Sequence, residues 1–299
     1  MKILFLLSLL LVLNAPFYFF ASEVSKNILI INSYHRGYGW TDEVCDSMRK
    51  ELERDKRIKN IYIEYLDRKR FPDDRIVDNL IALYKDKYRD IKPDAILTTD
   101  DAALKAALAL KKNIFLGVPI VFSGVSRNNA RLLIKDDIYL TGVYEEPDPE
   151  GNLKLMRRDI PGLKKVYIVH DKTESAMGIA RDIETIFKSE AKDIEREYVF
   201  DLTFEELLEY VKTFDKKTAV LLPSYAVDKG NLKYSPEEFA SKLSEVSPVP
   251  IYGMYYHMFG SGIIGGSLLN GRIHGEMAAK IVIRIIDGVP ISKIYPFEK

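Results

Sequence analysis

Nine short apolar runs, each followed by a polar or aromatic cluster, place the strongest constraint on how this chain folds. The first run, residues 28–31, ends at the cluster 32–35, and the last one ends at 255–257. Parallel strands read as continuous apolar runs because helices cover both faces of their sheet. In open α/β sheets of this kind, ligands bind beyond the carboxyl ends of the strands. The pattern therefore predicts an α/β protein that holds a small molecule at those ends.

Helical patterns separate the strand patterns, and the alternation begins again after the polar, proline-rich segment 145–151. Strands joined by helices in this way form parallel, right-handed βαβ units. The 299 residues are too many for one ordinary domain and suit two domains of roughly 100–150 residues each. We therefore expect two doubly wound lobes, with Thr41 and either Asp100 or Asp101 as helix N-caps.

The charge balance and the cysteine content exclude several classes of protein. Lys plus Arg and Asp plus Glu number 44 each, so the net charge is zero and no basic surface for nucleic acid is predicted. Cys45 is the only cysteine, which excludes an internal disulfide and a cysteine-based zinc site. Its place in an amphipathic helix predicts burial. The four histidines lack the spacing of metal ligands, so we expect no metal and no cofactor.

The motifs of common enzymes are missing or misplaced. Residues 260–265 match the pattern GxGxxG, but they do not follow the first strand of a βαβ unit, so a turn is the better interpretation. The sequence contains neither a phosphate-binding loop nor a nucleophile elbow. His35 and Asp100 would act as an acid–base pair only if the fold made them neighbours. The sequence thus favours a binding protein over an enzyme.

Residues 1–25 have the features of a signal peptide or of an N-terminal anchor. Lys2 supplies a positive charge, residues 3–13 are apolar, and 21–22 offer a cleavage site. Phe19 stands where a small residue is preferred, so an uncleaved anchor is the alternative. In either case we expect an exported protein, periplasmic or at the cell surface, free or tethered by this segment.

Residues at the ends of the predicted strands are the candidates for ligand binding. Aromatic rings offer stacking and cation–π contacts, and carboxylates among them suit an amino acid or an aromatic amine. The same residue types are common in turns and helix caps, so a structural role is the alternative for each. The candidates are Ser33, Tyr34, His35, Trp40, Asp100, Ser123, Gly124 and Tyr144 in the first half, and Asp171, Thr173, Ser224, Tyr225 and Tyr255 in the second.

Several short motifs, taken together in their order and spacing, resemble the type I periplasmic-binding-protein fold. The resemblance is to ABC transporter substrate-binding proteins of the tryptophan/tyrosine type. The same module occurs as the sensor region of some histidine kinases and diguanylate cyclases. The resemblance covers residues 26 to 295, and the motifs that carry it are 30–35, 39–41, 64–70, 99–104, 118–125, 141–145, 262–266 and 275–279.

This resemblance implies two lobes that are joined by three crossovers and close on a ligand. Lobe one would comprise residues 26–145 and 262–294, with a strand over 262–270 returning the chain to it. Lobe two would comprise residues 146–261, and 295–299 would begin the third crossover. The last strand and helix of lobe two would then be missing, which leaves two alternatives, a complete binding protein or the front part of a longer receptor.

We therefore expect an extracytoplasmic solute-binding protein that closes on a small ligand for the membrane permease of an ABC-type transporter. The alternative is the ligand-sensing domain of a membrane receptor, a histidine kinase or a diguanylate cyclase, whose partner would be a signalling domain. A third hypothesis is a two-domain enzyme that resembles glycosyltransferases.

Overall fold

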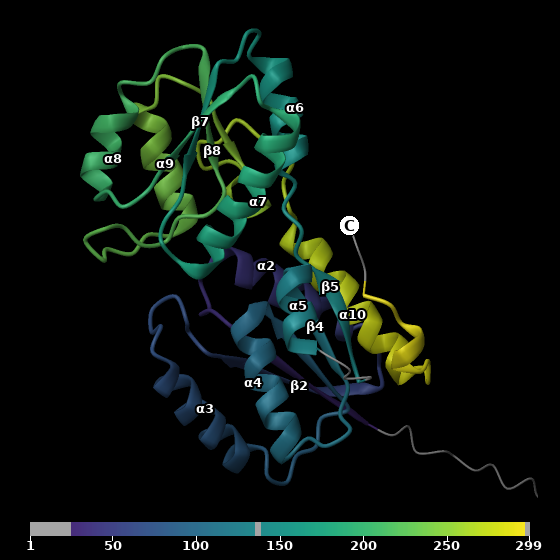
Figure 1. The fold of residues 1–299 in the computed structure, drawn as a ribbon. Helices are drawn as coiled ribbons and strands as arrows, with labels where there is room; N and C mark the ends of the chain where they lie inside the picture. The colour runs from purple at the N-terminus through teal and green to yellow at the C-terminus, as the bar shows by residue number, and fades with distance from the viewer. Residues whose placement is uncertain (1–24, 135–138, 297–299) are drawn as a thin grey trace, which may run out of the picture.

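Two parallel β-sheets, each covered by helices, form two lobes that lie one above the other in Figure 1. This computed structural model describes residues 25–134 and 139–296. The first lobe contains five strands in the order β2-β1-β3-β4-β5, and the second contains four in the order β7-β6-β8-β9. All pairings between these strands are parallel, which confirms the predicted doubly wound architecture.

The strands and helices alternate along the chain as the sequence predicts. The strands are β1 (Lys26–Asn32), β2 (Ile58–Tyr65), β3 (Ala95–Thr99), β4 (Ile120–Val125), β5 (Leu140–Tyr144), β6 (Lys165–Val169), β7 (Glu195–Val199), β8 (Thr218–Leu222) and β9 (Ile251–Gly253). The helices are α2 (Gly39–Leu52), α3 (Asp74–Lys87), α4 (Asp100–Asn113), α5 (Arg127–Ile134), α6 (Pro149–Asp159), α7 (Glu174–Glu190), α8 (Phe204–Val211), α9 (Pro236–Val246) and α10 (Gly271–Ile286).

Except at the edge strand β2, the first sheet is largely buried on both faces, which explains why its strands are mainly apolar. Ile28 and Ile30 of β1 belong to one hydrophobic cluster with residues of α2 and α10. Leu29 and Ile31 point the other way, into a second cluster with residues of α3, α4 and α5. Successive side chains of a strand lie on opposite faces, so both faces require apolar residues. Cys45 of α2 is buried and free, as predicted.

The last helix, α10, packs against α2 and so belongs to the first lobe, although it follows the second lobe in sequence (Figure 1). Asn270 caps it by accepting from the backbone N–H groups of Arg272 and Ile273. Gly275 allows the two helices to approach closely. A Cβ atom on it would overlap Ser47 Oγ and the backbone carbonyl oxygen of Val44.

The chain passes between the lobes twice among the described residues, once between β5 and α6 and once before α10. These two linkers are tied to each other. Ser267 Oγ donates to Asp148 Oδ2 at 2.7 Å, and Asn152 Nδ2 donates to the Ser267 carbonyl oxygen at 3.1 Å. They therefore form one narrow connection between the lobes.

The expected strand over 262–270 does not form as a regular strand, and it does not lie in the first lobe. Its backbone runs beside β9 instead, where Ile264 N–H donates to the Ile251 carbonyl and Leu269 N–H donates to the Met254 carbonyl. Only isolated bridges result. Glycines with positive φ, such as Gly262 at +101°, interrupt the extended conformation.

Two expected helix caps are also wrong. Helix α2 begins at Gly39, so Thr41 lies inside its first turn. At α4, Ser33 Oγ from the end of β1 accepts from Ala103 N–H at 2.8 Å, and the Asp100 carboxylate has a different partner, described below. Pattern analysis places caps by local sequence alone, and it cannot see a cap supplied by a distant residue.

The predicted signal peptide or anchor lies, except for Ser25, outside the described residues. Within the described part of the chain, no helix combines the length and the apolar character that crossing a membrane requires.

Candidate functional site

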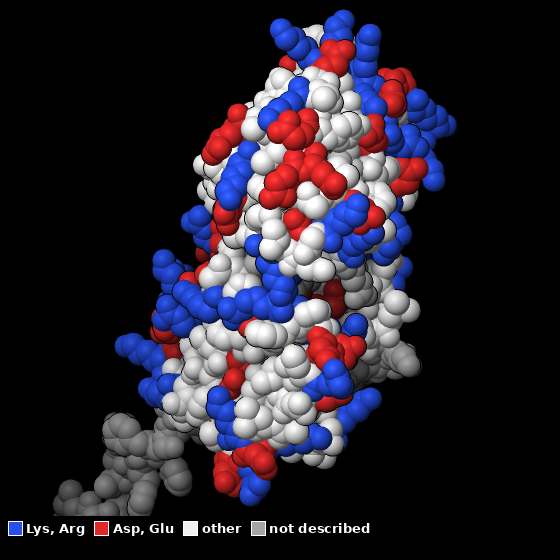
Figure 2. Space-filling view, turned by 90° about the vertical axis from the view of Figure 1, so that its left-hand side faces the viewer, with Lys and Arg blue, Asp and Glu red and all other residues white. Residues whose placement is uncertain are grey.

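A cleft of about 970 Å³ lies between the two lobes, at the carboxyl ends of both sheets. Ser33 and Glu145 line it from the first lobe and Asp171 and Asp201 from the second, each within two residues of a strand end. Figure 2 shows Lys and Arg side chains gathered across this face where the lobes meet, with acidic side chains deeper in a hollow. A narrower inner part of about 50 Å³ continues from the cleft.

Ten of the thirteen predicted ligand-binding residues line this cleft. They come from both halves of the sequence, as expected if the strand ends of two sheets face each other. Tyr34, Trp40, Asp100, Gly124, Ser224 and Tyr255 line the inner part. Ser33, Tyr34, Asp171, Thr173 and Tyr225 line the outer part.

The other three predicted residues do not line it. His35 Nδ1 lies 3.3 Å from Asp67 Oδ1 in the loop after β2. Ser123 is fully buried inside β4. Tyr144 packs on Phe122, with the Arg127 guanidinium 4.8 Å from its ring centroid. A position at a strand end predicts proximity to the cleft, but it does not predict which way a side chain points.

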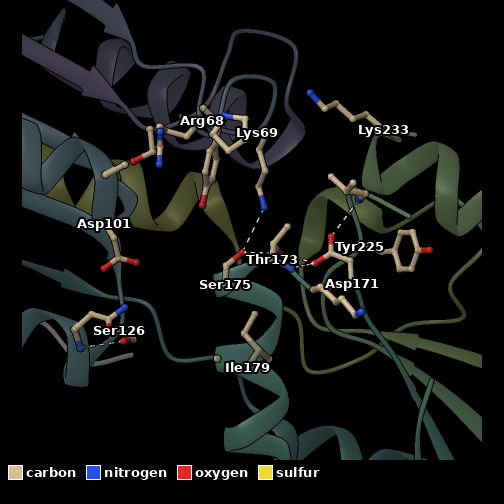
Figure 3. Close-up of a pocket in the computed structure, with 18 of the residues that line it drawn as sticks. Arg68, Lys69, Asp101, Ser126, Asp171, Thr173, Ser175, Ile179, Tyr225 and Lys233 are labelled. Atoms are coloured by element: carbon tan, nitrogen blue, oxygen red, sulfur yellow. Dashed lines mark hydrogen bonds between the residues drawn. The ribbon is translucent and has the colours of Figure 1, made fainter. Parts of the chain in front are cut away.

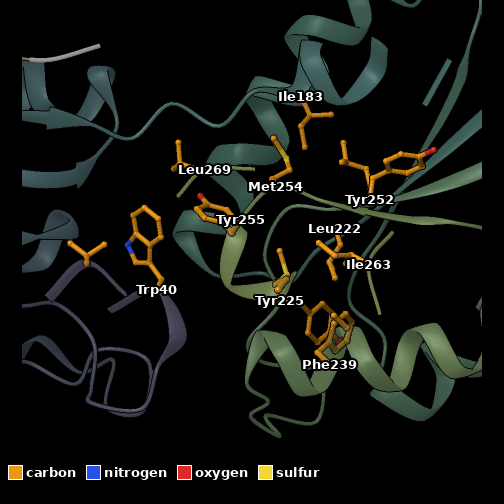
Figure 4. Close-up of a cluster of buried hydrophobic side chains, with 14 of the residues drawn as sticks. Trp40, Ile183, Leu222, Tyr225, Phe239, Tyr252, Met254, Tyr255, Ile263 and Leu269 are labelled. Carbon is orange, nitrogen blue, oxygen red and sulfur yellow. The ribbon is translucent and has the colours of Figure 1, made fainter. Parts of the chain in front are cut away.

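Two of the lining residues, Asp171 and Tyr225, mainly have a structural role. The Asp171 carboxylate accepts from the N–H groups of Thr173, at 2.8 Å, and of Ala226, at 2.7 Å (Figure 3). It thereby fixes the loop after β8. The Tyr225 ring is 4 % exposed and stacks on Phe239 with 3.8 Å between centroids, in the core of the second lobe (Figure 4).

Asp100 is the most unusual residue of the inner cleft. It is 5 % exposed, and its backbone has a φ of +65°, a conformation that costs free energy in any residue but glycine. Its Oδ1 accepts from the Trp40 indole N–H at 3.1 Å. Its Oδ2 is buried and has no hydrogen-bond partner among residues 25–134 and 139–296. The fold thus holds a strained, buried carboxylate with one oxygen unused.

Gly124 makes room for this carboxylate. It has a φ of +73°, and a Cβ atom on it would lie 2.8 Å from Asp100 Oδ1. Burial, followed by the negative charge of the nearby Glu145, raises the pKa of Asp100 well above its ordinary value. A positive charge that entered the inner cleft would relieve both effects.

Glu145 and Tyr255 also line the inner cleft. The Tyr255 hydroxyl donates to Glu145 Oε1, which joins the second lobe to the end of β5. Burial raises the pKa of Glu145 to about 7, although the Tyr255 hydrogen bond and the Lys69 charge both lower it. The Tyr255 ring meets the Trp40 ring edge to face at 5.4 Å (Figure 4), so aromatic surface and carboxylates alternate around the space.

The Glu145→Gln variant is expected to gain stability relative to the wild type as the pH rises. A carboxyl whose pKa is higher in the folded state than in the unfolded state binds its proton more tightly when folded, so its contribution to stability falls with increasing pH. Glutamine removes this contribution and keeps an oxygen that accepts from Tyr255. Between about pH 5 and pH 8, the difference in Tm should grow by about 2–6 °C.

Thermal unfolding of both proteins over that range checks this prediction. Shared groups whose pKa does not depend on Glu145 cancel in the difference, such as His257, whose pKa burial lowers to about 4. The pKa of Asp100, which Glu145 raises, falls in the variant and adds to the same trend. A difference in Tm that does not change with pH would contradict the raised pKa of Glu145.

The candidate residues did not include Lys69, although it lies in the motif 64–70 that carries the resemblance. Lys69 lines both parts of the cleft. The candidate residues also included Tyr144 and not its neighbour Glu145. The alternation of side chains along β5 carried the relevant signal, because residues 143 and 145 face one side of the sheet and 144 faces the other. His257 belongs to the cluster 255–257 that ends the last apolar run, but Tyr255 was chosen instead, and Ser175 had no signal of its own; both lie at the inner cleft.

The arrangement suits binding more than catalysis. The inner cleft offers an unused carboxylate oxygen, aromatic rings, and polar groups from both lobes. His35 and Asp100, the acid–base pair considered above, are not brought together: His35 pairs with Asp67, and Asp100 with Trp40.

Solved structures of other proteins share this fold over most of the chain. An ABC domain from Streptococcus pneumonia in complex with L-Trp is 13% identical, with 91% of this chain and 88% of that chain covered and a TM-score of 0.64. A ligand-free, open substrate-binding protein with adhesive properties from Clostridium difficile is 16% identical, with the same coverage and a TM-score of 0.62.

A LacI transcriptional regulator from Lactobacillus brevis is 15% identical, with 92% of this chain and 97% of that chain covered and a TM-score of 0.60. No protein-family model and no curated protein matches the sequence. The structural likeness shows that the chain has the fold of type I periplasmic binding proteins, as the sequence motifs predicted.

Proposed function

We propose that this protein is an extracytoplasmic solute-binding protein that closes its two lobes on a small ligand. The observation that carries the proposal is the Asp100 carboxylate, which is buried in the cleft between the lobes with Oδ2 unpaired. Unpaired buried charges are costly, so proteins keep them where a ligand supplies the partner. An amino acid or an aromatic amine supplies such a partner together with a body that fits among the rings.

Closure follows from the two-lobed construction. The ligand would contact groups of both lobes at once, Tyr34 and Asp100 from the first and Ser224 from the second. It therefore binds the closed state more tightly than the open state and shifts the equilibrium towards closure. The narrow connection between the lobes is suited to such a hinge.

We further propose that the closed form delivers its ligand to the permease of an ABC-type transporter. The apolar segment near the N-terminus supports export. The ABC domain that was solved with L-Trp supports an amino acid as ligand. A transcriptional regulator has a similar fold. Because the fold occurs in proteins of different function, the ligand has to be tested directly.

A thermal-shift screen against amino acids, aromatic amines and small carboxylates tests the proposal. A ligand that binds the folded state raises Tm by mass action. For the ligand that the screen identifies, Tyr34→Ala should weaken affinity by about 1–3 kcal/mol, because Tyr34 lines both parts of the cleft.

Tyr144→Ala is the matched control. Tyr144 is also a half-buried tyrosine near a strand end, but it lies outside the cleft, so its replacement should leave the affinity unchanged. Equal losses in both variants, or no shift with any compound of the three classes, would count against a ligand site between the lobes.

A further inference from the structure

Lys69 places the chain's own positive charge inside the cleft. It extends from the loop after β2 towards the second lobe, where Nζ lies 3.4 Å from Ser175 Oγ (Figure 3). The same Nζ lies 4.9 Å from the ring centroid of Tyr34 and 5.5 Å from that of Tyr38. An ammonium over the faces of two aromatic rings is a cation–π arrangement, here at the junction of the two lobes.

The charged groups that act on the pKa of Lys69 are all negative. Asp171 from the second lobe and Asp100 and Glu145 from the first each favour its charged form, while burial lowers its pKa. The inner cleft contains Asp100, Asp101 and Glu145 against this single lysine. His257 adds no positive charge at neutral pH, because burial and Lys69 lower its pKa to about 4. Carboxyl groups therefore outnumber the lysine in this space, and aromatic rings line it. A cation that entered would favour the charged forms of Asp100 and Glu145, whose pKa values burial raises, whereas a carboxylate would be repelled by them.

We propose that the ligand group entering the inner cleft is a cation, a protonated amine or a guanidinium. In the unliganded protein the ammonium of Lys69 occupies the position of that cation, and the ligand displaces it. This inference rests on the proposed function and specifies the charge of the ligand. Two observations support it independently. Oδ2 of Asp100 is unpaired and can accept from a donor on the ligand. The rings of Tyr34 and Tyr38 already contact a cation, the ammonium of Lys69.

Displacement requires little disruption of the fold. An ammonium has three donors, and among the described residues that of Lys69 uses one, in a long hydrogen bond to Ser175. Its flexible stem allows the head group to turn from the inner cleft to the larger, solvated outer part, which Lys69 also lines. A ligand cation has the advantage that it can reach Asp100 Oδ2, to which Lys69 does not donate.

Rescue of a Lys69→Ala variant by n-propylammonium tests the site with a probe of defined chemistry. The variant lacks three methylene groups and the ammonium, which n-propylammonium replaces atom for atom. At millimolar concentration this cation should raise the Tm of Lys69→Ala by about 2–4 °C more than KCl of equal ionic strength does. The neutral isostere 1-propanol should not raise it.

Lys233→Ala is the matched control. Lys233 also spans the cleft, since its Nζ donates to the Arg70 carbonyl oxygen at 2.5 Å, but it makes none of the cation–π contacts described for Lys69. It should show no such rescue. If n-propylammonium stabilised Lys69→Ala no more than KCl or 1-propanol, the proposal would be wrong.

A second variant, Lys69→Met, has a side chain one heavy atom shorter and uncharged, so it should fold with little void. With tyramine as the cationic probe, it should bind about tenfold more tightly than the wild type, because no ammonium of the chain competes for the site. The anionic analogue 3-(4-hydroxyphenyl)propionate should bind to neither protein.

The results separate this inference from the proposed function. If the wild type bound the propionate and Lys69→Met lost that binding, Lys69 would hold a carboxylate. That result would overturn the cation site and leave a ligand-binding protein. Absence of tyramine binding to both proteins would likewise overturn the cation site, whereas the proposed function is judged by the wider screen.

Discussion

Replacing Asp100 with asparagine is expected to stabilise the folded protein and, at the same time, to weaken the binding of a cationic ligand about a hundredfold. The two effects have one cause. The carboxylate is 5 % exposed, has one unpaired oxygen and lies near Glu145, so removing its charge relieves a cost that only a bound cation offsets. Asparagine is suited to the change because it tolerates positive φ and can still accept from Trp40.

Asp201→Asn is the matched control for this prediction. Asp201 also follows a strand of the cleft and has a φ of +62°, but its side chain is 44% exposed and pairs with Lys172 at 2.7 Å. Its replacement should bring no gain in stability. Thermal unfolding and titration calorimetry with the ligand from the screen measure both effects. If Asp100→Asn lowered Tm and kept full affinity, the carboxylate would have a structural role.

Gly275→Val is expected to lower the stability of the protein by about 3 kcal/mol or more. A Cβ at this position would overlap Ser47 Oγ and the Val44 carbonyl oxygen, and it would lie 3.0 Å from the Met48 backbone nitrogen. The Val44 oxygen and the Met48 nitrogen belong to the backbone of α2, which cannot change conformation as a flexible side chain can. Helix α10 must therefore move away from α2 and lose the packing that holds it on the first lobe.

Gly178→Val is the matched control, because Gly178 lies within helix α7 and the atom nearest to an added Cβ is the end of the Arg181 side chain, at 3.8 Å. Glycine and valine differ little in helix propensity, so Gly178→Val should be nearly neutral. Chemical denaturation of the two variants provides the comparison. Equal stability of Gly275→Val and the wild type would show that the helices can separate at little cost.

The sequence predicted the fold because the pattern behind it is local and repeated. Short apolar runs alternate with helical patterns along most of the chain, so parallel βαβ units were the natural interpretation. The strand over 262–270, which the resemblance implied, was wrong because glycines with positive φ, such as Gly262 at +101°, break the extended chain there. Helix α5, between β4 and β5, was not predicted from the sequence.

The site was predictable in location more than in detail. Strand ends identified the cleft, and Asp100, Trp40 and Tyr255 lie in it as proposed. The Tyr225 ring turned into the core because Phe239 offers it a stacking partner, and that partner comes from a helix that only the tertiary structure brings near. Lys69 was missed for the same reason, since the rings and carboxylates around it are distant in sequence.

The bond between Ser267 and Asp148 has a mechanical consequence. Because the two linkers are fastened together at that point, a rotation of one lobe against the other would turn about a single axis near it. Displacement then grows with distance from the axis, so the rim of the cleft moves farthest and the tied linkers hardly move. A pair of spectroscopic labels at the rim, on Phe71 and Leu232, would report such a motion with the greatest leverage.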